Sequence, residues 1–114
     1  MGKVSKVETF DLYGLSFPNL EESRLAVERA LGITLVPHES GYRGGDYYRL
    51  HDVGREHFIL QCNLHPLDRE WQEERHQDAP FLLYVNQTPR SEAIKNALEQ
   101  VPGIRQLRHR ILSS

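Results

Sequence analysis

Apolar residues recur along the chain with two different periods, and these periods predict its secondary structure. Alternation of apolar and polar side chains, or a short apolar run between turn signals, is typical of a β-strand. Apolar positions spaced three and four residues apart are typical of an amphipathic α-helix. The first pattern predicts strands over residues 7–12, 33–36, 46–50, 57–63, 81–85 and 107–112. The second predicts helices over residues 20–31 and 89–101.

Both predicted helices carry the local signals of helix ends. Asn19 followed by Glu22 has the form of a capping box, in which side chains satisfy the free amides of the first turn. Gly32 stands where a residue in the left-handed conformation usually ends a helix. The second helix is predicted to begin with Pro89 at its first position, where the missing N–H costs nothing. The Pro-Gly pair at 102–103 is predicted to end it.

The resulting order β-α-β-β-β-β-α-β predicts an α+β fold, with a single-layer, mostly antiparallel sheet and two helices on one face. With 114 residues the chain is long enough for one hydrophobic core, so we expect residues 1–114 to form a single domain. Pro37 is predicted to close the strand over 33–36. The polar segment 64–79 is predicted to be a long loop with room for a short helix. The order of strands within the sheet is left open.

The charge balance is uneven along the chain and changes the expected class of partner. The net charge is −2, but residues 8–78 hold 14 acidic residues against 7 arginines, whereas residues 90–110 hold 5 basic against 2 acidic ones. Nucleic-acid binders usually carry clustered cations, so we expect no nucleic-acid partner. An acidic face would suit a basic protein, although a solvated surface of mixed charge explains the same balance.

The compartment is predicted from the cysteine content and from the apolar runs. The single cysteine, Cys62, excludes an internal disulfide and suits a reducing compartment. No apolar run approaches the length of about 18 residues that a membrane helix needs. No secretory signal is expected, because Lys3 and Lys6 are not followed by an apolar stretch. These features predict a cytoplasmic protein with no membrane partner.

No catalytic or metal-binding motif emerges from the sequence. Cys62 and His65, with His57 and His76 on either side, form the one ligand-like group, but a second closely spaced pair is missing. The glycine-rich run at 41–46 lacks the Gly-Lys-Ser/Thr ending of a phosphate loop. We therefore expect no metal, no cofactor and no enzymatic activity.

Two segments are instead predicted to form a protein-binding surface. The Gly-rich hairpin concentrates Tyr and Arg, which are enriched at interface hot spots, and the loop 64–79 surrounds a single tryptophan with acids. An acidic rim around an aromatic anchor would steer and hold a basic protein. The candidate contact residues are Tyr42, Arg43, Asp46, Tyr48, Asp68, Glu70, Trp71, Glu73 and Glu74.

Four blocks of the sequence together resemble a known group of small bacterial proteins. They are Ala-Leu-Gly-Ile at 30–33, the run from His38 to Arg49, Phe-Ile-Leu-Gln-Cys-Asn at 58–63 and Pro-Phe-Leu-Leu-Tyr-Val at 80–85. The chain resembles immunity proteins of toxin systems, including contact-dependent growth inhibition, over roughly residues 20–112. The resemblance implies a cytoplasmic protein that binds one cognate toxin domain, often a nuclease, in a one-to-one complex and occludes its active site or substrate surface. It transfers no contact residue.

Two alternatives stay open at this point. A small enzyme or ligand-binding protein would need a pocket, for which His38, Glu39 and Tyr42 are the candidate lining residues. A homo-oligomeric module would also expose a large interface, although nothing in the sequence indicates one.

Overall fold

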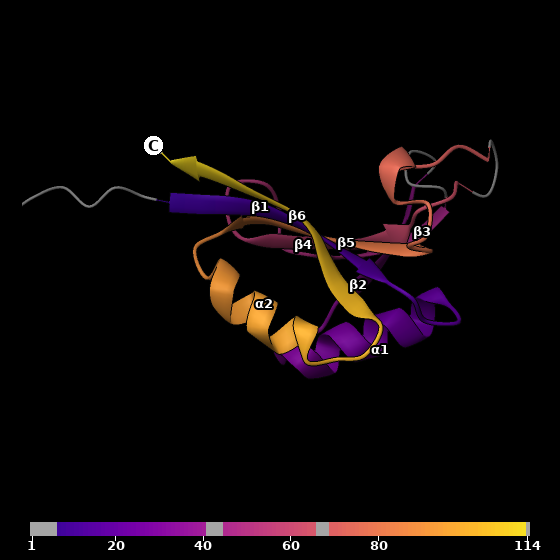
Figure 1. Cartoon of the computed structure of the whole chain (residues 1–114), viewed down its shortest axis with the longest axis horizontal. Coiled ribbons are helices and arrows are strands. Elements are labelled where there is room, and N and C mark those ends of the chain that lie inside the picture. The colour runs from indigo at the N-terminus through magenta and orange to yellow at the C-terminus, as the bar shows by residue number, and fades with distance from the viewer. Residues whose placement is uncertain (1–6, 41–44, 66–68, 114) are drawn as a thin grey trace, which may run out of the picture.

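The computed structural model describes residues 7–40, 45–65 and 69–113. They form six strands, two α-helices and one short 3₁₀-helix (Figure 1). The strands are β1 (Val7–Leu15), β2 (Val36–Ser40), β3 (Gly45–Leu50), β4 (His57–Cys62), β5 (Phe81–Thr88) and β6 (Ile104–Ser113). The helices are α1 (Leu20–Leu31), η1 (Glu74–His76) and α2 (Ser91–Glu99).

The strands make one open antiparallel sheet in the order β2-β3-β4-β5-β1-β6. Both α-helices lie side by side on one face, which we call the helix face (Figure 1). The α+β class, the element order and the placement of the helices are therefore confirmed. The sequence left the strand order open, and the structure inserts β1 between β5 and β6. Neither α1 nor α2 is long and apolar enough to cross a membrane.

The predicted ends of α1 are confirmed in atomic detail. The side chain of Asn19 accepts a hydrogen bond from the Glu22 amide at 2.8 Å. Gly32 adopts a φ of 66°, and its N–H donates to the carbonyl of Glu28 at 2.8 Å. A side chain with a β-carbon is strained in this left-handed conformation, so glycine is the fitting residue there.

The predicted bounds of β2 and α2 were wrong, and β1, β5 and β6 extend beyond the predicted residues 7–12, 81–85 and 107–112. The predicted end of α2 at residue 101 is also too late, since the helix ends at Glu99. β2 covers Val36–Ser40, so Pro37 lies inside the strand and does not close it. Proline is tolerated there because β2 is an edge strand, where a missing N–H need not break a ladder. α2 begins at Ser91, not at Pro89. The side chain of Thr88 accepts the Arg90 amide at 3.1 Å, which turns the chain before the helix begins.

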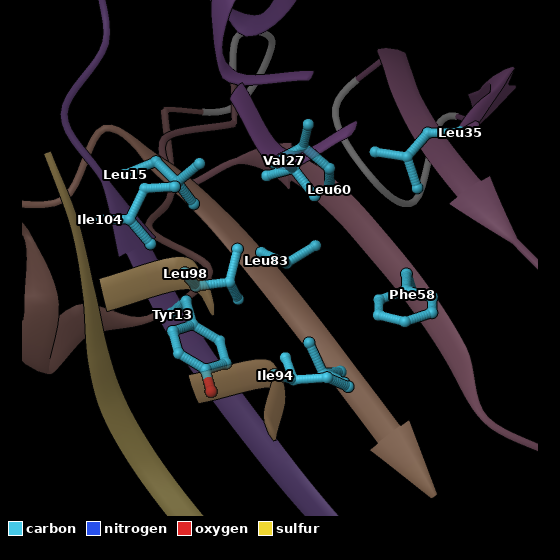
Figure 2. Close-up of a cluster of buried hydrophobic side chains, with 11 residues drawn as sticks. Tyr13, Leu15, Val27, Leu35, Phe58, Leu60, Leu83, Ile94, Leu98 and Ile104 are labelled. Carbon is cyan, nitrogen blue, oxygen red and sulfur yellow. The ribbon is translucent and has the colours of Figure 1, made fainter. Parts of the chain in front are cut away.

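The main hydrophobic core fills the space between the sheet and the two helices (Figure 2). Ile94 and Leu98 of α2 lie over Tyr13 of β1 and Leu83 of β5. The buried members are Tyr13, Leu15, Val27, Leu35, Phe58, Leu60, Leu83, Val85, Ile94, Leu98 and Ile104.

A second, smaller apolar cluster lies on the opposite face of the sheet, which we call the outer face. Leu12, Leu82 and Ala79 are buried there, with Tyr84 and Leu107 packed around them. Ala79 comes from the segment after β4, so this segment covers part of the outer face. A β-carbon added to Gly14 would lie 2.9 Å from the Ala79 Cβ, which shows how closely the segment approaches β1.

Candidate functional site

The two segments that the sequence predicted as a binding surface lie at the same end of the sheet. The hairpin of β2 and β3 turns at the pair Ser40–Gly45, and the 64–79 segment leaves β4 beside the pair Cys62–Phe81 (Figure 1). Asp46 lies close enough to Cys62 for its charge to act on the thiol. Burial, assisted by this carboxylate, raises the pKa of Cys62. Residues distant in sequence are thus brought to the same end of the sheet.

The candidate contact residues at this end differ in how exposed their side chains are and in the contacts that the side chains make. Asp46, Glu70 and Glu74 are exposed and Trp71 is half-buried. We call this set, Asp46, Glu70, Trp71 and Glu74, the acidic end. Tyr42, Arg43 and Asp68 lie outside the described residues. Tyr48 and Glu73 are described, and both side chains make contacts within the fold.

Asn63 fixes the backbone beneath the acidic end. The residue is fully buried, and its amide group donates to the carbonyls of His76 at 2.8 Å and Ala79 at 2.9 Å. Its side-chain oxygen accepts the Glu73 amide at 2.8 Å, and its own carbonyl accepts the Gln72 amide at 2.7 Å. The Asn63 side chain therefore makes backbone hydrogen bonds in a segment where no helix or sheet supplies them. Residues 69–79 of the expected long loop contain the 3₁₀-helix η1 and are held by these bonds.

The tryptophan of the acidic end is placed by a short antiparallel contact. Trp71 forms an isolated β-bridge with Leu64, and the amide of His65 donates to the Glu70 carbonyl at 2.7 Å. Glu70 and Trp71 are consequently adjacent on a turn that returns toward β4. Along the chain Trp71 stands between Glu70 and Glu74, and the backbone on both sides of it is hydrogen-bonded, through His65 on one side and Asn63 on the other.

Glu73, a predicted contact residue, is tied to the outer face. Its carboxylate accepts a hydrogen bond from the Tyr84 hydroxyl at 2.6 Å and from Arg108 at 3.1 Å. Burial alone would raise the pKa of Glu73, but the bonds from Tyr84 and Arg108 outweigh it and the pKa is lowered. Burial, with the nearby Glu73 carboxylate, raises the pKa of Tyr84. The carboxylate therefore anchors the segment to β5 and β6.

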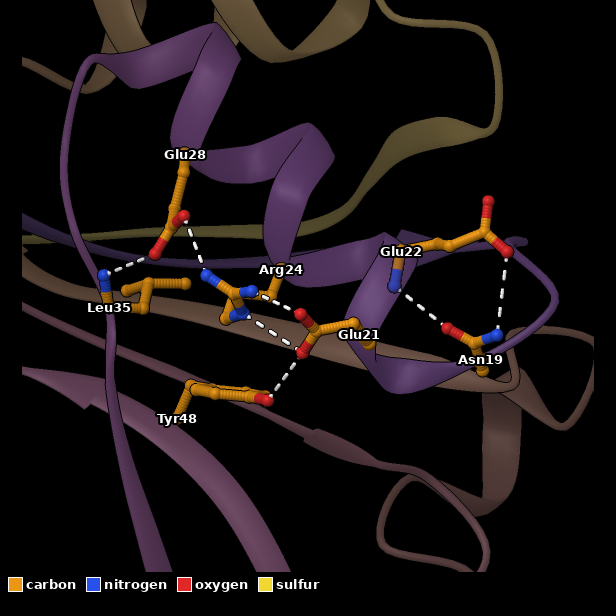
Figure 3. A network of polar contacts seen from close by, with 7 residues as sticks. All are labelled: Asn19, Glu21, Glu22, Arg24, Glu28, Leu35 and Tyr48. Carbon is orange, nitrogen blue, oxygen red and sulfur yellow. Dashed lines mark hydrogen bonds and ion pairs between the residues drawn. The ribbon is translucent and has the colours of Figure 1, made fainter.

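Tyr48, another candidate contact residue, joins β3 to α1 (Figure 3). Its hydroxyl donates to Glu21 at 2.8 Å, and the guanidinium carbon of Arg24 lies 5.4 Å from its ring centroid. Arg24 also binds Glu28, whose carboxylate accepts the Leu35 amide at 2.7 Å. Burial and the bond to Glu21 raise the pKa of the Tyr48 hydroxyl. The network holds β3 against the helix next to the acidic end.

A third carboxylate, Glu56, links the entry to β4 with the start of α2. It accepts a hydrogen bond from the Thr88 hydroxyl at 2.6 Å and one from Arg90 at 2.9 Å. Burial opposes ionisation, but the bonds from Arg90 and Thr88 prevail and lower the pKa of Glu56. Like Glu73, this group stabilises the fold in its charged form.

Stability is expected to fall in acid because of Glu56 and Glu73. The folded-state pKa of each lies below its ordinary value of 4.5, so the stabilisation is complete above about 4.5 and is lost as the pH falls through the folded value. Urea unfolding from neutral pH down to about pH 3 measures this loss. Glu73→Gln should lower the unfolding free energy by about 1.5 kcal/mol at neutral pH and flatten the acid slope. The exposed Glu39→Gln is the control that keeps the full slope, and an unchanged slope in Glu73→Gln would contradict the assignment.

Sequence reasoning missed a polar network around Asp11 on the helix face. The Asp11 carboxylate is fully buried and accepts hydrogen bonds from Ser91 at 2.6 Å and Thr9 at 3.1 Å. Its other oxygen lies 2.6 Å from His109 Nδ1. The three partners come from α2, β1 and β6. The available signal was one carboxylate at a core-facing position of a strand, which indicates a buried partner without naming it.

The three side chains of this network do not have the geometry of a catalytic triad. In a triad the carboxylate and the serine bind opposite nitrogens of the histidine. Here Asp11 and Ser91 both lie at Nδ1, with Ser91 Oγ 3.4 Å from that nitrogen and donating to Asp11. The histidine therefore does not activate the serine. A hollow of about 420 Å³ lies beside them, lined by Ser91, Glu92, Lys95, Asn96, Gln106 and His109. The network pins α2 to the sheet.

The enzyme or ligand-binding alternative needs a pocket near His38 and Glu39, and a hollow of about 340 Å³ does lie there, lined by Pro37, His38, Glu39, Asp46, Tyr47 and Tyr48. His38 and Glu39 contribute to it from adjacent positions. These neighbours on β2 point to opposite faces of the sheet, and His38 stacks on Tyr47 with ring centroids 5.4 Å apart. Tyr42 lies outside the described residues. Within residues 7–40, 45–65 and 69–113, no group of three His, Cys, Asp or Glu side chains is placed to hold a metal ion.

No protein-family model, curated protein or solved structure matches this chain. We therefore infer function from the acidic end itself, together with the resemblance between sequence blocks.

Proposed function

We propose that this chain is a cytoplasmic immunity protein that binds one cognate toxin domain and neutralises it by occlusion. The observation that carries the proposal is that two independently predicted segments lie at the same end of the sheet and both present exposed acids there. Asp46 comes from the β2–β3 hairpin, and Glu70, Trp71 and Glu74 come from the segment after β4. The resemblance to immunity proteins supports the same class of function.

The chemistry of the acidic end favours a basic protein surface. Carboxylates steer a cationic partner during diffusion and fix its orientation on contact. A half-buried tryptophan supplies the type of large apolar contact that dominates binding energy at many interfaces. A toxin that acts on nucleic acid has a cationic substrate surface, so an acidic inhibitor can cover that surface in place of the substrate.

The frame beneath the acidic end supports tight binding. Asn63 holds the segment backbone, Glu73 ties it to β5 and β6, and the network of Tyr48 holds the neighbouring hairpin strand. A surface that is ordered before binding loses less conformational entropy on association. In this mechanism the protein performs no turnover and needs no cofactor, since inhibition follows from covering the toxin.

The proposal is tested by co-expressing the chain with the protein encoded beside its gene. We expect co-purification as a one-to-one complex and rescue of growth. The triple variant Asp46→Lys, Glu70→Lys, Glu74→Lys should weaken the complex by about a hundredfold, because three attractions become repulsions. The matched control is Glu92→Lys with Glu99→Lys, two exposed acids on α2, which should bind normally.

The possible outcomes test two claims separately, namely that the chain neutralises a toxin and that the acidic end is the contact surface. Failure of both co-purification and rescue would overturn toxin neutralisation. A complex that forms, and that the triple variant binds with undiminished affinity, would exclude the acidic end as the contact surface. Circular dichroism and thermal unfolding of the triple variant establish that it is folded before its affinity is compared.

A further inference from the structure

The edge formed by β6 differs from the opposite edge of the sheet. β6 is ten residues long, contains no proline and pairs, among the described strands, only with β1. β2, at the other edge, has five residues and includes Pro37. In an antiparallel pair, the amides and carbonyls that do not bind the neighbour point outward. The outer side of β6 is therefore a long template for another strand, whereas β2 is a short and interrupted one.

The last residues of β6 project from the body of the domain. β5 ends at Thr88, which pairs with Thr9, so Val7 and Glu8 pair with β6 alone. Figure 1 shows the ends of β1 and β6 reaching beyond α2 and the rest of the sheet. Ile111 is 64% exposed and Leu112 60% exposed, which is high for large apolar side chains. A strand added beside them would cover apolar surface on both faces.

The charge of β6 selects the kind of strand that can be added. Residues 104–113 include Arg105, Arg108 and Arg110 and no acid. Arg105 forms an ion pair with Asp78 and Arg108 with Glu73, which leaves Arg110 as the exposed cation nearest the projecting end. Opposite charges on adjacent strands stabilise their pairing, and like charges oppose it. An acidic residue facing Arg110 is thus favoured.

A hollow beside Arg110 has room for such a side chain. It measures about 410 Å³ and is lined by Phe10, Asp11, Tyr84, Asn86, Arg108, Arg110, Ile111 and Leu112, all of which except Asp11 and Ile111 belong to the outer face. The aromatic ring of Phe10 and the side chain of Leu112 suit an aliphatic stem, and Arg110 suits a carboxylate. A glutamate has both parts.

We propose that β6 accepts an extended segment of a partner protein as an added antiparallel strand, with acidic and apolar side chains alternating along it. The acidic side chains face Arg110 on the outer face, and the apolar side chains cover Ile111. Backbone hydrogen bonds along β6 supply much of the affinity, and the side chains set the register. This surface lies at the end of the sheet opposite the acidic end, and the inference does not depend on the partner being a toxin.

A second copy of this chain fits the edge less well. Two β6 strands would bring three arginines each and no carboxylate from either strand, so pairing would place like charges on neighbouring strands without forming an ion pair. We therefore expect the free protein to be monomeric in sedimentation experiments. A concentration-dependent dimer that disappears in an Arg110→Glu variant would instead assign β6 to self-association and overturn the proposal.

The test uses a synthetic peptide that alternates Glu and Val, added to the full chain and followed by amide NMR shifts. We expect shifts confined to β6 and the adjoining part of β1, and slower hydrogen exchange of β6 amides. Arg110→Glu should weaken binding roughly fivefold or more. Arg29→Glu, an exposed arginine on α1, is the matched control and should bind the peptide as the unchanged chain does.

Two further peptides make the result decisive. A peptide alternating Lys and Val tests charge, and a Glu-Val peptide with alternate backbone amides N-methylated tests strand addition. Both should fail to shift β6. Equal binding of either one, shifts at β2 in place of β6, or no shifts with the first peptide would overturn the proposal. The triple variant of the acidic end should keep its affinity for the Glu-Val peptide, which separates this surface from the proposed toxin contact.

Discussion

Replacing Asn63 with alanine is expected to lower the free energy of unfolding by about 3 kcal/mol and to release the segment of residues 69–79. The substitution leaves the carbonyl of Ala79 and the amide of Glu73 without the side-chain partner, and removes one of the two hydrogen bonds that the His76 carbonyl accepts. A buried polar group that loses its hydrogen bond costs about 1–3 kcal/mol, and water can reach some of these groups once the segment opens. The loss of order should also weaken any complex formed through the acidic end.

Chemical denaturation measures the stability, and hydrogen exchange of residues 69–79 measures the release. Asn96→Ala on the exposed surface of α2 is the matched control and should change the unfolding free energy by less than about 0.5 kcal/mol. If Asn63→Ala unfolds at the same urea concentration as the unchanged chain and keeps slow exchange in the segment, Asn63 does not organise it.

Asp11→Ala is expected to destabilise the fold by about 2 kcal/mol. The buried carboxylate accepts hydrogen bonds from Ser91 and Thr9 and contacts His109. Its removal therefore leaves groups from three elements without this partner. The two hydroxyls can rotate toward other acceptors, which keeps the loss below that at Asn63. Asp11→Asn should be intermediate, because the amide retains one acceptor oxygen and the size of the original side chain.

A double-mutant cycle between Asp11→Ala and Ser91→Ala measures the coupling directly. We expect the double variant to lose less than the sum of the single losses, because both changes remove the same bond. Asp52→Ala, which removes an acid that is 92% exposed, serves as the control and should have little effect. Strict additivity would show that the contact between Asp11 and Ser91 contributes nothing to stability.

The parts of the fold that were predictable are those fixed by neighbours in the sequence. The cap at Asn19 and the left-handed Gly32 depend on residues within one turn, and both ends of α1 were correct. The predicted start of α2 was wrong because a neighbouring residue acts against the local signal. Pro89 is suited to a first helical turn, but Thr88 remains in β5 and its hydroxyl directs the turn at Arg90, so the helix begins two residues later than Pro89.

The position of β2 depended on tertiary contacts that a strand pattern does not contain. Leu35 is buried in the core and its amide binds Glu28, which holds residues 33–35 near the helix. Pairing with β3 then starts at Val36, and Pro37 is harmless because the edge is free. The sequence pattern identified an apolar run but not which part of it joins the sheet.

The sequence identified which segments form the candidate surface, but it could not predict how those segments are arranged in space. Charge and aromatic content drew attention to the hairpin and to the 64–79 segment, yet only the sheet order brings them to one end. Glu73 illustrates the difference, because an acid in a polar loop resembles a surface group until Tyr84 and Arg108 are placed beside it. The partners of Asn63 lie 10–16 residues away, and Asp11 has two partners 80 and 98 residues away, so a local pattern could not show their roles.

The place of β1 between β5 and β6 sets the order in which the domain can be completed on the ribosome. Thr9 bonds to Thr88, 79 positions later, and Asp11 contacts His109, 98 positions later. The first strand to be synthesised is therefore without both neighbours until nearly all of the rest has emerged. The local units α1 and the β2–β3–β4 meander can form earlier, but β1 can join the sheet only after β5 has been made, and β6 can join only after β1 is in place. Such long-range closure is typical of slow folding, and it makes the nascent β1 the segment most in need of protection from wrong pairing.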